Sequence, residues 1–370
     1  MPERVLITGG AGFIGSHVAD ELLARGYAVR ALDNLTAQVH GESKRPDYLA
    51  ADVELQVGDV RDPEAVGRAL DGVDSVVHLA ARVGVGQSMY EIANYTLANS
   101  GGTAVLLEAL LDHPVRRLVV ASSMSIYGDG AYRNESGELV EPGPRERAQL
   151  ERGEWEPHGV DGEVIEPVPT PETTQPSLTS IYALTKYEQE RACLIFGSAY
   201  SVPTVALRLF NAYGTRQALS NPYTGVLAIF ASRLLNDRPP PVFEDGLQRR
   251  DFVSVRDVAR AFRLALVRDE AAGQAINVGS GESVTVLEIA ARLAAILDKQ
   301  IEPEVTRRYR VGDVRHCFAD VSRAERLLGY VPEVQLDAGI AELAKWLEGQ
   351  VATDRVEQAS AELAARGLTF

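Results

Sequence analysis

The chain has 370 residues, 45% hydrophobic and 24% charged, a composition typical of a globular protein with one large or two modest domains. The formal net charge of −15 argues against nucleic acid or an anionic membrane surface as a partner, and no apolar run approaches the ~20 residues of a membrane helix. Neither the two cysteines nor the six histidines show disulfide or metal-ligand spacing, and a strand expected from Arg4 leaves no room for a signal peptide, so we expect a cytoplasmic protein without a metal site.

Short apolar strands alternate with helical patterns in the first half of the chain. Strands are predicted at residues 4–8, 28–32, 53–57, 74–79 and 117–121, and helices at 13–25, 63–70 and 97–111. Strands buried on both faces form continuous apolar runs, and helices connect them when they are parallel. The sequence therefore predicts an α/β fold: a Rossmann-type doubly wound parallel sheet, followed by a smaller C-terminal α/β substrate domain.

A segment at about 129–168, rich in Gly, Pro and Glu, interrupts this alternation. Residues 129–172 hold twelve Asp or Glu against four Arg, a local charge of −8. We interpret the segment as a solvated, partly irregular surface insertion, with a lid over the substrate as the alternative. Beyond it we predict a helix at 182–200, a strand at 204–209, and further helices at 258–267 and 286–297, and one amphipathic helix over the tail.

A glycine-rich loop lies between the first strand and the first helix. Gly9, Gly12 and Gly15 suit, in turn, a tight turn, the close approach of backbone N–H groups to a pyrophosphate, and helix–sheet packing. The pyrophosphate would lie at a helix N-terminus, where the dipole favours an anion. Asp33 ends the second strand, where its carboxylate would accept both ribose hydroxyls and repel a 2′-phosphate. This pattern favours NAD over NADP.

The ends of the third and fourth strands face the same crevice, so Asp59 is expected near the adenine. His78, which ends the fourth strand, is interpreted as a structural residue. The predicted cofactor-binding residues are Gly9, Gly12, Phe13, Ile14, Gly15, Asp33, Asn34, Asp59, Val60, Leu79, Ala80 and Ala81, and the resemblance described below implies Lys186 as a further one.

These patterns predict that the chain is divided into three parts. Residues 1–208 are expected to form the NAD-binding Rossmann domain, including the insertion. Residues 209–350 are expected to form mainly the substrate-binding domain, with about 251–273 returning to the Rossmann domain. Residues 351–370 are expected to form a C-terminal helical tail.

Tyr182 and Lys186 form the pattern Y-x-x-x-K, which places both side chains on one face of a helix. A neighbouring ammonium and the positive nicotinamide would lower the pKa of the phenol and make it a usable base. Alone, a Tyr–Lys pair at this spacing is usually two exposed side chains without a catalytic role, but here it follows a dinucleotide-binding motif. Ser123 follows the fifth strand, where its hydroxyl would bind the reacting oxygen of a substrate. We predict Ser123, Tyr182 and Lys186 as the catalytic residues.

Together these motifs resemble the extended short-chain dehydrogenase/reductase family of NAD-dependent nucleotide-sugar epimerases and dehydratases, over roughly residues 4–346 apart from the insertion. The segment from Arg208 to Gly214 resembles the family's R-x-F-N-x-Y-G motif, which implies that Asn211 contacts the sugar nucleotide. The segments at Arg250 and Arg310 resemble those whose arginines bind the diphosphate, a role that suits a guanidinium.

The residues after Ser123 separate the chemistries of the family. Dehydratases that resemble this segment carry Asp-Glu there, and they use this acid–base pair to eliminate water. Met124 and Ser125 stand in those positions here. The resemblance therefore implies an NAD-dependent sugar-nucleotide 4-epimerase, which oxidises C4 transiently and ends each turnover with oxidised NAD. A nucleotide-sugar dehydrogenase or reductase shares every motif, whereas the catalytic residues argue against a non-catalytic NAD-binding module.

The resemblance also indicates a substrate. The resemblance places Cys317 where a small residue widens the sugar pocket, and across its length the chain is similar to dTDP-L-rhamnose 4-epimerases; UDP-glucuronate and UDP-glucose or UDP-galactose are alternatives. The predicted substrate-binding residues are Ser123, Met124, Asn211, Arg250, Arg310 and Cys317. The resemblance also implies a homodimer, formed by pairing the helix at 97–111 with the helix that carries Tyr182.

Overall fold

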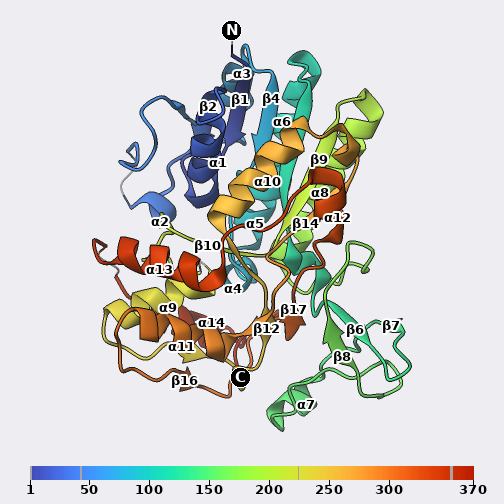
Figure 1. Ribbon diagram of the computed structural model, residues 1–370, viewed down its shortest axis with the longest axis vertical. Coiled ribbons are helices and arrows are strands. Elements are labelled where there is room, and N and C mark those ends of the chain that lie inside the picture. Colours follow the sequence, from blue (N-terminus) through green and yellow to red (C-terminus); the bar gives the residue numbers. More distant parts are fainter. Residues whose placement is uncertain (1, 42–43, 224, 351–352) are drawn as a thin grey trace.

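A seven-stranded parallel sheet forms the centre of the molecule in a computed structural model that describes residues 2–41, 44–223, 225–350 and 353–370 (Figure 1). Every neighbouring pair of its strands is parallel, in the order β14-β9-β5-β4-β1-β2-β3. The strands are β1 (Arg4–Thr8), β2 (Ala28–Asp33), β3 (Glu54–Val57), β4 (Ser75–His78), β5 (Arg117–Ser123), β9 (Thr204–Leu209) and β14 (Ala275–Val278). This sheet confirms the predicted fold class.

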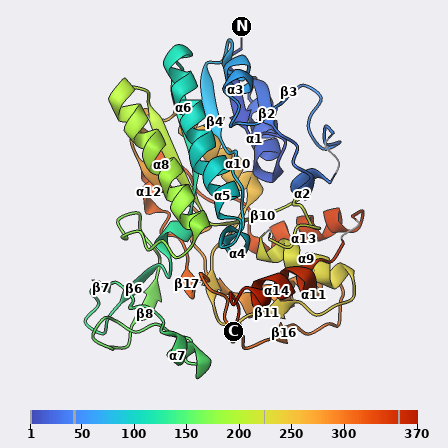
Figure 2. The same ribbon diagram turned by 180° about the vertical axis from the view of Figure 1, so that it is seen from behind.

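Helices cover both faces of the sheet, as Figures 1 and 2 show from opposite sides. On one face lie α1 (Phe13–Leu23), α10 (Val255–Val267) and α12 (Ser322–Leu328); on the other lie α3 (Pro63–Leu70), α6 (Gly102–Asp112) and α8 (Ile181–Tyr200). Successive strand residues point to opposite faces of the sheet. Ile7 therefore packs in the core beneath α1, α10 and α12, whereas Leu6 packs in the core beneath α3, α6 and α8.

The strand order reverses at β1, which lies between β2 and β4. In open parallel sheets the ligand crevice lies at the carboxyl ends of the strands beside such a point. The edge strand β14 was not predicted, and it lies beyond residue 273, where the returning segment was expected to end. Only four residues long, β14 carries little periodicity of its own.

The smaller C-terminal unit is built around three helices, α9 (Val226–Leu235), α11 (Val286–Ile296) and α13 (Leu336–Leu347), whose apolar faces form one cluster. Small sheets frame this cluster. Their strands are β10 (Asn211–Tyr213), β11 (Pro241–Val242), β12 (Arg249–Arg250), β13 (Phe252–Ser254), β15 (Val284–Thr285), β16 (Glu304–Val305) and β17 (His316–Cys317). Two of the three helices, α9 and α13, were not predicted.

The insertion forms a three-stranded antiparallel sheet with one short helix, away from the main sheet (Figure 1). Its elements are β6 (Ala131–Arg133), β7 (Leu139–Val140), α7 (Arg147–Glu151) and β8 (Glu166–Val168). The remainder of the insertion is turns and irregular chain.

Two predicted helices differ in the structure. The helix expected at 97–111 begins earlier, as α5 (Ile92–Tyr95), and continues through a π-helical segment (Thr96–Gly101) into α6. The tail is helical only over α14 (Val356–Ala365); it turns at Gly367, whose φ of 68° favours glycine, and residues 351–352 lie outside the described residues. The other short helices of the described residues are α2 (Ala37–His40) and α4 (Val85–Ser88), with 3-10 turns at Met124–Tyr127 and Asp269–Ala271. Within the described ranges, no helix is long and apolar enough to cross a membrane.

Candidate active site

The glycine loop is built as the sequence predicts. Gly9 has a φ of 70°, and its N–H donates to the Leu32 carbonyl of β2 at 2.8 Å. A Cβ on Gly15 would lie 2.2 Å from the Gly9 carbonyl oxygen, so only glycine permits this approach of helix and loop. A Cβ on Gly12 would meet only the Gly9 oxygen, at 3.3 Å, and would otherwise project into open space. The loop is therefore a cradle at the N-terminus of α1 that fits a pyrophosphate.

This cradle gives a matched pair of expected results. Gly15→Ala should destabilise the protein by about 1–3 kcal/mol, because the added methyl overpacks the loop. Gly12→Ala should leave the thermal midpoint nearly unchanged and yet weaken NAD binding at least about tenfold, because its methyl occupies the ligand side. Thermal unfolding and NAD titration measure the two effects. Parent-like NAD affinity in Gly12→Ala would show that the pyrophosphate does not pass there.

Asp33 is fixed at the end of β2, directly beside the cradle. Its carboxylate accepts from the N–H of Ala11 at 3.0 Å and from the N–H of Leu35 at 2.9 Å, and His40 Nε2 lies 3.6 Å away. These contacts hold the carboxylate beside the cradle, where it would meet the cofactor ribose and repel a 2′-phosphate. The local geometry thus fits NAD.

Other predicted cofactor residues surround the same crevice. The Asp59 carboxylate accepts from Arg61 and, at 3.0 Å, from Asn34 Nδ2; these hydrogen bonds, led by that of Arg61, hold the pKa of Asp59 well below its usual value. Val60 packs against Gly102, and Ala80 packs against Gly9. The half-buried residues Phe13, Ile14, Leu79 and Ala81 complete the predicted set.

His78 is buried beneath this crevice. Its ring nitrogens pair with Thr8 Oγ1 at 2.7 Å and Thr103 Oγ1 at 2.9 Å. Burial, with the positive charge of Lys186, lowers the pKa of His78 to about 3, so the imidazole is neutral. A neutral ring held on both sides between two structural elements agrees with the predicted structural role.

The structure brings Ser123 and Tyr182 together. Ser123 is the last residue of β5, and Tyr182 lies in the first turn of α8, which Ser180 caps. Burial raises the pKa of the Tyr182 phenol, and a hydrogen bond with Ser123 partly offsets this increase. Ser88 Oγ accepts from the Tyr182 N–H at 3.0 Å and anchors the start of α8.

Lys186 lies one turn further along α8 and is buried. Its ammonium donates to Gln189 Oε1 at 2.7 Å, and burial lowers its pKa to about 8. Burial and Ser123 are the influences on the pKa of the Tyr182 phenol, and the combined effect of Lys186 and a nicotinamide stays a prediction.

Sequence reasoning missed two polar residues in this cluster. Gln189 Nε2 donates to Thr103 Oγ1 at 2.8 Å, so the Gln189 side chain joins Lys186 to the residues around His78. Its position three residues after Lys186, on the same helix face, was the available signal. Ser125 Oγ lies 2.8 Å from Ser123 Oγ and extends the hydroxyl chain. No motif distinguishes Ser125, because its contact depends on the 3-10 turn after β5.

The predicted diphosphate and sugar contacts lie on the C-terminal unit. Asn211 Oδ1 is buried and has no hydrogen-bond partner among the described residues, which suits contact with a ligand donor. The Arg250 guanidinium donates to the carbonyls of Arg315, at 2.8 Å, and Val314. Arg310 forms a two-point ion pair with Asp313, at 2.6 and 3.0 Å. The C-terminal unit thus supplies two arginines and one buried amide oxygen without a partner among the described residues.

Met124, the residue immediately after Ser123, lies in one apolar cluster with Phe210 and Cys317. Burial raises the pKa of the Cys317 thiol to about 12, so it stays protonated and apolar. The fold therefore brings Met124 and Cys317 together next to Ser123.

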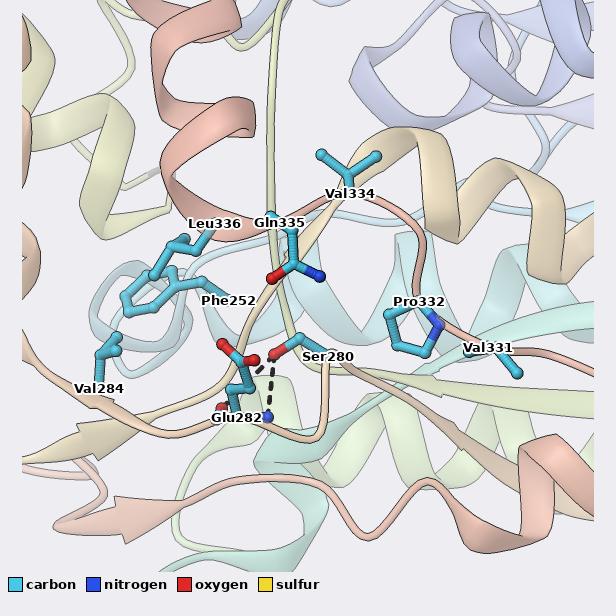
Figure 3. Close-up of a pocket in the computed structure, with 9 residues that line it drawn as sticks. All are labelled: Phe252, Ser280, Glu282, Val284, Val331, Pro332, Val334, Gln335 and Leu336. Carbon is cyan, nitrogen blue, oxygen red and sulfur yellow. Dashed lines mark hydrogen bonds between the residues drawn. The ribbon is translucent and has the colours of Figure 1, made fainter.

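A separate pocket of about 240 Å³ lies beside α13 (Figure 3). In it Ser280 Oγ accepts from the Glu282 N–H at 3.2 Å. Its lining consists of Phe252, Ser280, Glu282, Val284, Val331, Pro332, Val334, Gln335 and Leu336. None of these is a predicted site residue, so this pocket is distinct from the candidate site.

A family model, the NAD dependent epimerase/dehydratase family, matches residues 5–147 and 159–279. The chain belongs to this family. The unmatched residues between the two stretches fall inside the insertion. This membership explains why the glycine cradle, Ser123 and Tyr182 occur together, and it agrees with the extended short-chain dehydrogenase/reductase resemblance of the sequence.

The similarity to known relatives covers nearly the whole chain. The chain is 38% identical to dTDP-L-rhamnose 4-epimerase of Burkholderia thailandensis, over 93% of this chain and 95% of the relative. Among solved structures, UDP-glucose 4-epimerase of Thermotoga maritima with UDP-glucose has a TM-score of 0.77 and 30% identity, covering 93% of this chain and 98% of that chain. UDP-glucuronic acid 4-epimerase of Bacillus cereus, with UDP-glucuronic acid and NAD, has a TM-score of 0.76 and 26% identity, covering 93% and 99%. These findings confirm the predicted family, the predicted enzyme class and NAD as the cofactor.

Proposed function

We propose that the substrate of this epimerase is dTDP-L-rhamnose and that the enzyme inverts its C4 configuration. The observation that carries the proposal is the apolar cluster of Met124, Phe210 and Cys317 beside Ser123. A 6-deoxy sugar carries a methyl group, which gains free energy in such surroundings. The 38% identity to a relative with this activity supports the same substrate.

In this proposal Tyr182 is the general base and acid. NAD, when bound, supplies reversible oxidation at C4 and a positive charge close to the phenol. Tyr182 takes the proton of the sugar 4-hydroxyl and later returns it, while Ser123 holds the sugar oxygen by a hydrogen bond. Lys186, together with the positive charge of NAD, would stabilise the phenolate electrostatically. The glycine cradle and Asp33 would hold the cofactor, and Asn211, Arg250 and Arg310 would hold the nucleoside diphosphate.

The substrate assignment is tested by comparing catalytic efficiency across four sugars: dTDP-L-rhamnose, UDP-glucuronate, UDP-glucose and UDP-galactose. NMR follows the C4 configuration. We expect the largest kcat/KM for dTDP-L-rhamnose. A larger kcat/KM for UDP-glucose would instead favour the function of the structural relative from Thermotoga maritima, and no inversion of any sugar would contradict the 4-epimerase assignment.

We also propose a homodimer, formed through α8 and the helix that contains α6. Large apolar side chains are exposed on both: Leu97 (56%) and Leu111 (50%), and Leu184 (39%) and Ile195 (60%) on α8. Light scattering should give twice the 40.0 kDa of one chain. Ile195→Asp should shift the mass toward a monomer, because the charge would lose its hydration in the interface. Val267→Asp on α10, also exposed, is the matched control. A monomeric parent at working concentration would contradict the proposal.

A further inference from the structure

The part of the tail from α14 to the last residue, 356–370, meets the insertion at residues 309–317, the segment that carries Arg310 and Cys317. We propose that the tail and the insertion together position Arg310 for the substrate diphosphate. This inference rests on the proposed function, in which Arg310 contacts the diphosphate. It assigns a role in substrate binding to two parts of the chain whose sequence carries no motif.

The end of the tail pairs with the Arg310 segment through backbone hydrogen bonds. Tyr309 and Phe370 exchange two such bonds, at 2.8 and 3.1 Å, and the Val311 N–H donates to the Leu368 carbonyl at 2.9 Å. Arg310 stands opposite Thr369 in this short antiparallel pairing. Because Arg310 lies between the paired residues, the pairing restricts the backbone that carries the guanidinium.

Two arginines of the insertion pack against the same pair. The Tyr309 and Phe370 rings lie 5.3 Å apart. The Arg147 guanidinium lies over the Phe370 ring at 4.5 Å, and that of Arg145 lies over the Tyr309 ring at 5.2 Å. Cations over aromatic rings attract the ring quadrupole. The insertion thus holds the tail and the Arg310 segment against each other.

A chain of contacts continues from Arg145 to the Arg310 guanidinium. Arg145 donates to the Asp313 carbonyl at 2.9 Å and to Glu244 Oε1 at 2.9 Å. The Asp313 carboxylate in turn forms the two-point ion pair with Arg310. The Asp313 carbonyl is therefore hydrogen-bonded to Arg145 while the Asp313 carboxylate binds Arg310. Arg145 thus holds in place the residue that orients the Arg310 guanidinium.

The insertion also holds the far end of the segment. The buried Arg315 pairs with Glu244 at 2.8 Å and with Glu156 of the insertion. His316 Nε2 lies 2.8 Å from the other Glu156 oxygen. Charged hydrogen bonds of this kind are geometrically specific. They place β17, and hence Cys317, relative to the insertion.

The tail reaches the catalytic side as well. A Cβ on Gly86 of α4 would lie 3.4 Å from the Leu363 side chain, and Glu362 accepts from the Tyr90 hydroxyl at 2.9 Å. In the same short helix, α4, Ser88 anchors the start of α8 at Tyr182. Figure 2 shows α14 lying close to α4 and to the C-terminal unit. The tail thus links the Arg310 segment to the element that supports the catalytic tyrosine.

The test measures binding of UDP and dTDP, which needs no knowledge of the sugar, together with KM and kcat for dTDP-L-rhamnose. The variants are Phe370→Ala, Arg147→Ala and a chain ending at Arg355. We expect the dissociation constants and KM to rise about tenfold for Phe370→Ala and the shortened chain, because Arg310 would be correctly placed only part of the time. For the two point variants, Phe370→Ala and Arg147→Ala, saturated kcat and NAD content should match the parent, a separation that a general loss of structure would not produce. Gln358→Ala, on the exposed face of α14, is the matched control.

Arg310→Ala separates this inference from the proposed function. If Arg310→Ala weakens binding of the nucleoside diphosphates and Phe370→Ala and Arg147→Ala do not, the positioning role is wrong and the assignment of Arg310 stands. If Arg310→Ala binds them as the parent does, both the assignment and the inference built on it are overturned. Should the shortened chain fail to fold, the two point variants still decide between these results.

Discussion

Replacing Tyr182 with Phe should reduce the rate of C4 inversion by roughly a thousandfold, within the range that loss of general acid–base catalysis produces. The phenol is the group that the fold places against Ser123, and its only change in this variant is the loss of the oxygen that carries the proton. NAD binding should stay unchanged, because the glycine cradle and Asp33 are untouched. NMR of the C4 configuration measures the rate, and absorbance after denaturation measures the bound cofactor.

Tyr187→Phe is the matched control for this result, since Tyr187 lies on the same helix, packs partly against the apolar cluster and has no assigned proton-transfer role. It should keep nearly the full rate. A Tyr182→Phe variant that inverts C4 at the parent rate would rule out the phenol as the base.

Replacing Arg208 with Met should cost about 3–5 kcal/mol of folding free energy, the range for breaking a buried ion pair by removing one partner. Arg208 contacts Glu190 through two nitrogens, at 2.6 and 2.9 Å, and both residues are buried. Ser122 Oγ donates to the same carboxylate at 2.7 Å. Without the guanidinium, the Glu190 charge would remain buried beneath the strand that ends in Ser123.

Urea unfolding measures this effect as a shift of the midpoint at constant slope. Arg152→Met is the control, because Arg152 forms its ion pair with Glu154 on the exposed surface and should show no measurable shift. Replacing Glu190 with Leu in the Arg208→Met background should recover part of the loss, since no buried charge then remains. A loss below about 1 kcal/mol for Arg208→Met alone would mean that the Glu190 charge is neutralised in another way.

The sheet and the cofactor cradle could be predicted because their signals are local. The spacing of Gly9, Gly12 and Gly15 between a strand and a helix is a local signal. Two of these positions require glycine in the structure: Gly9 has a φ of 70°, and a Cβ on Gly15 would lie 2.2 Å from the nearest backbone atom. The strand bounds differ from the prediction by only one or two residues, because each strand is a continuous apolar run on a sheet buried on both faces.

The tail and the insertion could not be predicted in the same way, because their structure depends on contacts between distant residues. Arg145 and Glu244, 99 positions apart, form an ion pair that no spacing rule connects. The tail has an amphipathic pattern, but whether it continues as a helix is decided at Gly367 by pairing with the Arg310 segment. Likewise, β14 is a strand because β9 offers it an edge.

The central claim, that this enzyme inverts C4 by removing and returning the same hydrogen, is tested most directly with dTDP-L-rhamnose carrying deuterium at C4. The protein is incubated with the labelled sugar, and NMR and mass spectrometry follow the label and the configuration. We predict a C4-inverted product that retains its deuterium, with no accumulation of reduced cofactor. Loss of the deuterium to water, or reduced cofactor formed in proportion to an oxidised sugar, would contradict the account.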